Sequence, residues 1–232
     1  MELLPTDAAS GTTPSNITLP PQARAFGRLI DHQNIAPGDL LLTRPFGGRE
    51  NDWVSRGIVK AQASAYEEQD AQWTHAAVCL GDGQNVVEAN FKIPGLRRGV
   101  MIRNLQEYAD GQHALKLRRP RMSDLERYRI VIGALTQGKQ TYDFSYLIRL
   151  AWNAWRGRGL WDSNQRPIRI SSKAVVCSTL YAQAMHYASN IELGGRARIC
   201  VPALLSCSNY FTDVQLRWLA LQKPTEQGQD LI

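Results

Sequence analysis

Two β-rich runs joined by a tight turn constrain the fold of this chain more than any other feature. The runs cover residues 74–80 and 85–89, and Gly81-Asp82-Gly83-Gln84 separates them. A short turn of Gly and Asp between two such runs is typical of a β-hairpin. The sequence therefore predicts an antiparallel strand pair, and around it a sheet that is antiparallel.

Other segments predict a mixture of strands and helices. We expect strands at residues 40–43, 99–102 and 114–117, and helices at residues 23–31, 52–65, 123–137, 142–155 and 177–189. Residues 211–221 fit either a strand or a helix. The prediction is an α+β fold in which the helix that begins at residue 177 packs on the antiparallel sheet.

The size and composition suit one domain. The chain has 232 residues, of which 44% are hydrophobic and 21% charged, so it can bury a sizeable core. Residues 1–22 are rich in Thr, Ser, Pro and Ala and predict a flexible N-terminal lead. We place a single folded domain at residues 23–222 and a C-terminal tail at residues 223–232.

A cysteine lies where an extended segment turns into a helix. Val175 and Val176 are β-branched, and Cys177 opens an apolar, helix-forming run. A thiol in the first turn of a helix feels the positive end of the helix dipole, which favours the thiolate. Because the thiolate is the nucleophile, Cys177 is the candidate catalytic residue, although a cysteine in an apolar helix can also be a packed small residue.

The hairpin offers a base for this thiol. His75 lies early on its first strand and Glu88 late on its second, so the two approach each other across the ladder. A carboxylate beside an imidazole fixes its tautomer and stabilises the imidazolium. We therefore expect a triad of Cys177, His75 and Glu88. The alternative is that Glu88 is a carboxylate at the rim of the site with no role in the chemistry.

The other cysteines predict no metal site. Cys79, Cys200 and Cys207 complete a set of four, with no Cys-x-x-Cys pair, so we expect free thiols and neither a structural zinc nor a cofactor. Cys200 and Cys207 are close enough in sequence to form a disulfide, and whether they do so stays open at this point. His186 lies on the Cys177 helix almost three turns further on, too far to reach the thiol.

Six short motifs carry a family resemblance. They are Pro37-Gly38-Asp39-Leu40-Leu41-Leu42, Thr74-His75-Ala76-Ala77-Val78, Val86-Val87-Glu88-Ala89, Tyr142-Asp143-Phe144, Val176-Cys177-Ser178-Thr179-Leu180 and Val201-Pro202-Ala203-Leu204-Leu205. In this order they resemble the circularly permuted, papain-like branch of the NlpC superfamily, the YiiX-like proteins, over residues 36–218. In papain-like enzymes the catalytic cysteine precedes the histidine in the chain. Here His75 precedes Cys177, as in a circularly permuted chain.

The resemblance implies a role for each matching position. Cys177 resembles the nucleophile, His75 the general base and then general acid, and Glu88 the orienting third member. Tyr142 matches a tyrosine that lines the site in similar proteins, and its hydroxyl would help the Cys177 amide to stabilise an oxyanion. Two departures, Thr179 and the Arg- and Trp-rich stretch at residues 151–169, leave the substrate open.

The expected activity is thiol-dependent cleavage of an amide, and the resemblance implies the short stem peptides of bacterial cell wall as substrate. One alternative is acyl chemistry on lipids, as in proteins similar to lecithin:retinol acyltransferase, with the stretch 151–169 facing the lipid. Another is a binding module that keeps the fold without the reaction.

Charge and the N-terminal sequence indicate partners and location. The net charge of +6 and pI of about 9.3 favour an anionic polymer or membrane surface. Nucleic acid is not expected, because no zinc-finger spacing, RNP motif or long basic run occurs. No secretory signal is expected, so the chain would stay in the cytoplasm or leave by a signal-independent secretion system. An exported antibacterial effector would have that machinery and an immunity protein as partners.

Overall fold

The centre of the protein is a six-stranded sheet. The computed structural model describes residues 8–9, 19–46, 53–90, 99–138, 141–142, 152–153, 155–157, 160, 174–193 and 200–221. The sheet has the order β10-β7-β3-β4-β5-β6, and every neighbouring pair is antiparallel. Its strands are β3 (Leu40–Pro45), β4 (His75–Cys79), β5 (Asn85–Asn90), β6 (Gly99–Asn104), β7 (His113–Pro120) and β10 (Phe211–Val214). The hairpin, now β4 and β5, and the α+β class with an antiparallel sheet are confirmed.

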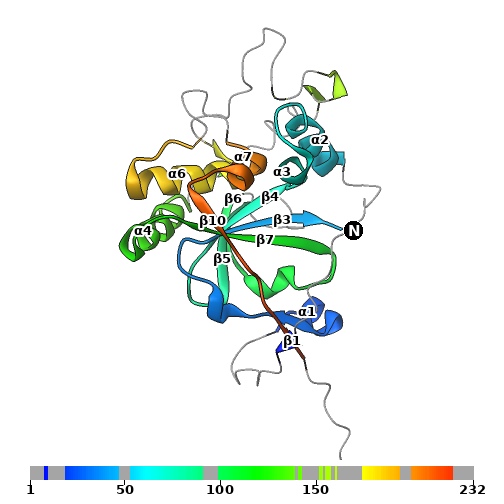
Figure 1. Ribbon diagram of the computed structural model, residues 1–232, viewed down its shortest axis with the longest axis vertical. Helices are drawn as coiled ribbons and strands as arrows, with labels where there is room; N and C mark the ends of the chain where they lie inside the picture. Colours follow the sequence, from blue (N-terminus) through cyan, green and yellow to red (C-terminus); the bar gives the residue numbers. More distant parts are fainter. Residues whose placement is uncertain are drawn as a thin grey trace, which may run out of the picture.

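Two helices cover one face of the sheet (Figure 1). They are α4 (Asp124–Leu135) and α6 (Cys177–Ser189), and they pack against each other and against β4 and β5. Strand residues that alternate along the chain, among them Leu40, Leu42, Ala76 and Val78, form one buried cluster with these helices. The start of α6 is therefore fixed over the β4–β5 hairpin.

The opposite face is covered by segments near the two ends of the chain and by a short 3₁₀ helix that follows β6. These are α1 (Pro21–Phe26), η1 (His32–Asn34), η2 (Leu105–Tyr108) and a small sheet of β1 (Ala8–Ala9), β11 (Trp218–Ala220) and β2 (Arg28–Ile30). The intervening strand residues, such as Leu41, Ala77, Cys79 and Val86, form the second buried cluster. The central strands β3, β4 and β5 are therefore buried on both faces.

A buried glutamine holds together two helices that precede the hairpin and one that lies near the C-terminal end of the chain. These are α2 (Trp53–Gln62), α3 (Glu68–Ala71) and α7 (Pro202–Cys207). The side-chain amide of Gln62 donates to the carbonyls of Ala71 and Trp73, each at 2.8 Å, and accepts from the N–H of Ala203 at 2.9 Å. Because Trp73 lies two residues before His75, this contact fixes the chain entering β4.

The helix predictions are confirmed in part. The helix predicted at 123–137 is α4, and Ser123 and Glu126 form the capping box that its sequence indicates. The helix at 177–189 has the predicted bounds. The helix expected at 23–31 is wrong beyond Phe26, because Gly27 takes a left-handed φ of 74° that ends α1, and β2 follows.

The helix predicted at 142–155 is wrong at its first residue. Tyr142 belongs to the short strand β8 (Thr141–Tyr142), which pairs in parallel with β9 (Ala174–Val175). Pairing with a distant strand overrides the local preference of this segment, and residues 143–150 lie outside the described part. Residues 211–221 contain two strands, β10 (Phe211–Val214) and β11 (Trp218–Ala220), and no helix. No helix in the described segments is long and apolar enough to cross a membrane.

Candidate active site

Cys177 is the first residue of α6. The preceding residue, Val176, is extended and offers no side-chain cap. Thr179 fixes the turn instead, since its hydroxyl accepts from the N–H of Val176 at 2.9 Å and donates to the carbonyl of Val176 at 3.0 Å. Thr179, a departure from the family pattern, therefore has a structural role at the start of this helix.

The N-terminus of α6 provides an electropositive setting for the thiol. The first amides of a helix have no acceptor in the preceding turn and carry the positive end of the dipole. Cys177 lies among them and is buried, with 6% of its surface exposed. Its amide is therefore placed to donate to an oxyanion that forms on a substrate attacked by its own sulfur.

The structure brings His75 and Glu88 together. The Nε2 of His75 lies 2.8 Å from Oε2 of Glu88. In the β4–β5 ladder Val78 pairs with Val87, so Glu88 lies diagonally across from His75 on the same face of the sheet. The hairpin therefore orients the imidazole as the sequence predicts.

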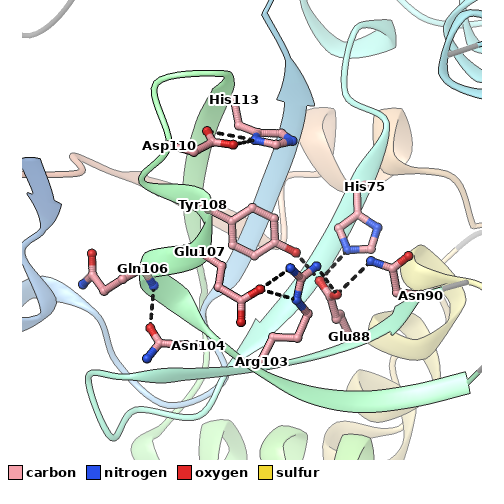
Figure 2. A network of polar contacts seen from close by, with 10 residues as sticks. All are labelled: His75, Glu88, Asn90, Arg103, Asn104, Gln106, Glu107, Tyr108, Asp110 and His113. Atoms are coloured by element: carbon pink, nitrogen blue, oxygen red, sulfur yellow. Dashed lines mark hydrogen bonds and ion pairs between the residues drawn. The ribbon is translucent and has the colours of Figure 1, made fainter. Parts of the chain in front are cut away.

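Glu88 is fully buried, and both of its oxygens are occupied (Figure 2). Oε2 contacts Nε2 of His75 and accepts a hydrogen bond from the hydroxyl of Tyr108. Oε1 accepts hydrogen bonds from Nδ2 of Asn90 at 2.9 Å and from Nη1 of Arg103 at 3.2 Å. Burial alone would raise the pKa of this carboxyl, but His75, Arg103 and Tyr108 outweigh it and hold the pKa well below its usual range. Glu88 is thus an anion at neutral pH, and the interpretation as a rim carboxylate is wrong.

His75 interacts with Cys177 as well as with Glu88. Burial lowers the pKa of the imidazole, but the nearby Cys177 and Glu88 outweigh burial and raise the pKa to about 10. Because Nε2 faces Glu88, Nδ1 is the nitrogen left for the thiol. The buried anion of Glu88 beside it favours the imidazolium form of His75.

Three residues of this network were missed from the sequence. Asn90 lies two positions after Glu88 on β5, so the two residues share one face of the strand. Arg103 on β6 pairs with Val86 on β5, which puts it on that same face. Alternation along β5 and β6 was a usable signal for both. Tyr108 had no such signal, because its place depends on how η2 folds back after β6.

Tyr142 is the fourth predicted site residue. Its backbone pairs with Val175, two residues before the nucleophile, so β8 runs beside the approach to Cys177. Its side chain lies outside the described part of the structure. The role of the Tyr142 hydroxyl at the oxyanion stays a prediction.

The remaining cysteines are all free thiols, and Cys200 and Cys207 do not form a disulfide. Cys79 is packed in the second buried cluster. Cys200 is buried as well. Its pKa is raised mainly by burial and, to a smaller extent, by the nearby Cys177. Among the described residues no group of three or more His, Cys, Asp or Glu side chains is arranged to hold a metal.

A scan against protein-family models found no match, and a search of curated proteins found no significantly similar sequence. The function is therefore inferred from the geometry of the site.

Proposed function

We propose that the protein is a thiol hydrolase that cleaves an amide bond, with Cys177 as nucleophile, His75 as acid and base, and Glu88 as the orienting carboxylate. One observation carries this proposal: the buried anion of Glu88 holds Nε2 of His75 at 2.8 Å, on the hairpin against which α6, the helix that begins at Cys177, packs. A thiol beside an imidazole that is itself oriented by a carboxylate forms a nucleophilic triad.

The reaction follows from the charges of these groups. The Cys177 thiolate attacks the amide carbonyl, and the oxyanion that forms accepts a hydrogen bond from the Cys177 N–H. The His75 imidazolium gives its proton to the leaving amine, and the C–N bond breaks to leave a thioester. Neutral His75 then takes a proton from water, and the water oxygen attacks the thioester carbonyl. The C–S bond breaks and the carboxylic acid leaves, so that Cys177 is again a thiolate and His75 an imidazolium.

The substrate proposal depends on the family resemblance and on charge. The YiiX-like pattern favours peptide bonds, and we propose the stem peptides of bacterial cell wall. A net charge of +6 suits an anionic polymer of this kind. Use as an antibacterial effector delivered to a neighbouring cell would supply access to that substrate.

A second candidate, hydrolysis or transfer of lipid acyl groups, is favoured by an exposed aromatic pair. Trp152 and Trp155 have 54% and 59% of their surfaces exposed, and the guanidinium of Arg156 lies 4.7 Å from the ring centre of Trp152. Exposed tryptophans beside an arginine suit the interface of a membrane. The same triad would then act on an ester.

One experiment separates the two candidates. Purified protein is incubated with peptidoglycan fragments and, separately, with phospholipid vesicles, and the products are identified by mass spectrometry. Amide cleavage that is lost in Cys177→Ala and His75→Ala, and kept in the matched controls Cys207→Ala and His186→Ala, supports the first. Ester turnover that falls in Trp152→Ala supports the second, and no product from either substrate contradicts both.

A further inference from the structure

A cavity lies apart from the triad, at one edge of the main sheet. It has a volume of about 790 Å³, within the range of about 300–1,000 Å³ that is usual for ligand sites. None of Cys177, His75 and Glu88 lines it. We call it the edge cavity, and define it by the β7 residues 113–116, by Gln215, Leu216 and Trp218 after β10, and by the side chains named below.

The edge cavity forms because β10 leaves β7 early. The two strands pair only from Phe211 with Pro120 to Val214 with Leu117, and the chain then turns away to pair with β2 as β11. In Figure 1 the segment after β10 runs toward α1 while β7 continues in another direction. Residues 113–116 are partly exposed, unlike Leu117 and Arg118, and no described strand pairs with them on this side.

The hydrogen-bond pattern of β7 shows which groups face the gap. On the β3 side the N–H of Phe46 donates to the carbonyl of Gln112, in step with the pairs that β3 makes with Ala114 and Lys116. Main-chain groups alternate between the two sides of an antiparallel strand, so those of His113 and Leu115 face outward. Pro45, which has no N–H to give, pairs opposite His113 and agrees with this assignment.

The walls of the edge cavity are aromatic and basic. The aromatic side chains are Phe26, Phe46, Trp73 and Trp218, and the basic ones are Arg28, His113 and Lys116. His113 pairs with Asp110, and Lys116 lies 3.8 Å from Asp213, but neither carboxylate lines the cavity. Trp73 is 94% buried, since 6% is exposed, yet no described residue accepts a hydrogen bond from its indole N–H. A buried donor without a partner is unfavourable, so this site is suited to receive an acceptor.

We propose that the edge cavity binds an extended acidic peptide, which joins the sheet as a strand beside His113 and Leu115. Main-chain bonds to a free sheet edge give such a peptide its affinity, and pockets for alternate side chains give it specificity. Apolar side chains of the peptide pack on the aromatic walls, and its carboxylates lie near Arg28 and Lys116.

The open edge of β7 and the triad lie on the same sheet, separated by β3. Thr43 pairs with Leu115 on one side and with His75 on the other. The open edge is therefore two strand spacings, about 10 Å, from the base. The site binds by main-chain pairing, so it does not depend on the proposed chemistry.

The test uses the full chain with Cys177→Ala, so that bound peptide is not cleaved. The probe is a fluorescent peptide of about seven residues, an ordinary strand length, in which Glu alternates with Phe and Val. We expect fluorescence anisotropy to show binding that weakens at least about tenfold when Glu is replaced by Lys, or when one alternate set of peptide amides is N-methylated. N-methylation of the other set changes it little. Arg28→Glu weakens binding, and Arg129→Glu on the exposed face of α4 is the matched control.

Amide hydrogen exchange measured by NMR gives an independent readout without a variant in β7. In the free protein, exchange at His113 and Leu115 is fast and exchange at Ala114 and Lys116 is slow. The peptide protects His113 and Leu115. Absence of binding, equal effects of the two N-methylated peptides, or protection that does not follow this alternation would overturn the proposal.

Discussion

The buried carboxylate of Glu88 provides the most informative stability test. Glu88→Gln keeps the shape of the side chain and removes its charge. It leaves Arg103 and the His75 imidazolium without their common anion, and it places an N–H where two donors already point. Breaking a buried ion pair costs about 3–5 kcal/mol, and we expect the low end, because Arg103 keeps its bond to Glu107.

The sign of the pH dependence is fixed by the lowered pKa of Glu88. A carboxyl with a depressed pKa stabilises the fold above its ordinary value of 4.5, and that stabilisation is lost as the pH falls. The free energy of unfolding of the wild type should therefore fall below about pH 4.5, and Glu88→Gln should lack this part of the slope.

The assay is urea unfolding followed by circular dichroism at neutral and acid pH. Glu107→Gln is the matched control, because that carboxylate is 31% exposed and pairs with the same arginine. Its loss should cost less than about 1 kcal/mol. If Glu88→Gln costs no more than Glu107→Gln, the network does not stabilise the protein as described.

Three further predictions follow from contacts around the triad. Tyr108→Phe removes a donor to the Glu88 anion and should lower the free energy of unfolding by about 1.5–3 kcal/mol, whereas the exposed Tyr128→Phe should change it little in the same urea assay. Thr179→Val should cost about 1 kcal/mol and slow turnover by loosening the start of α6, and unchanged values in both measurements would contradict its role. Because the pKa of His75 is raised to about 10, its contribution to stability is complete below 6.5 and is lost as the pH rises toward 10. Unfolding curves of the wild type and His75→Gln should therefore converge over that interval.

Much of the candidate site could be predicted from local sequence. A Gly-Asp-Gly turn fixes the hairpin, and the hairpin alone brings His75 and Glu88 within reach of each other. The change from β-branched residues to a helical run places Cys177 at a helix start. These inferences succeeded because each depends on residues that are close in the chain.

The surroundings of the triad depend on distant contacts and could not be predicted as well. Tyr142 lies in a strand because Val175, far along the chain, pairs with it. Tyr108 reaches Glu88 only because β6 returns beside β5 and η2 folds back from it. The open edge of β7 exists because β10 turns away after Val214, and no local pattern marks that departure.

The reactivity of Cys177 tests the central claim most directly. Iodoacetamide is applied across pH 5–10, the labelled peptides are quantified by mass spectrometry, and Cys207 in the same sample is the internal control. In the wild type we expect Cys177 to be labelled at neutral pH at least about tenfold faster than Cys207, because the His75 imidazolium favours the reactive thiolate. In His75→Ala the labelling rate of Cys177 should fall more than about tenfold at neutral pH. If the Cys177 profile matches that of Cys207, or is the same in His75→Ala, the imidazole does not activate the sulfur and the proposed hydrolase is contradicted.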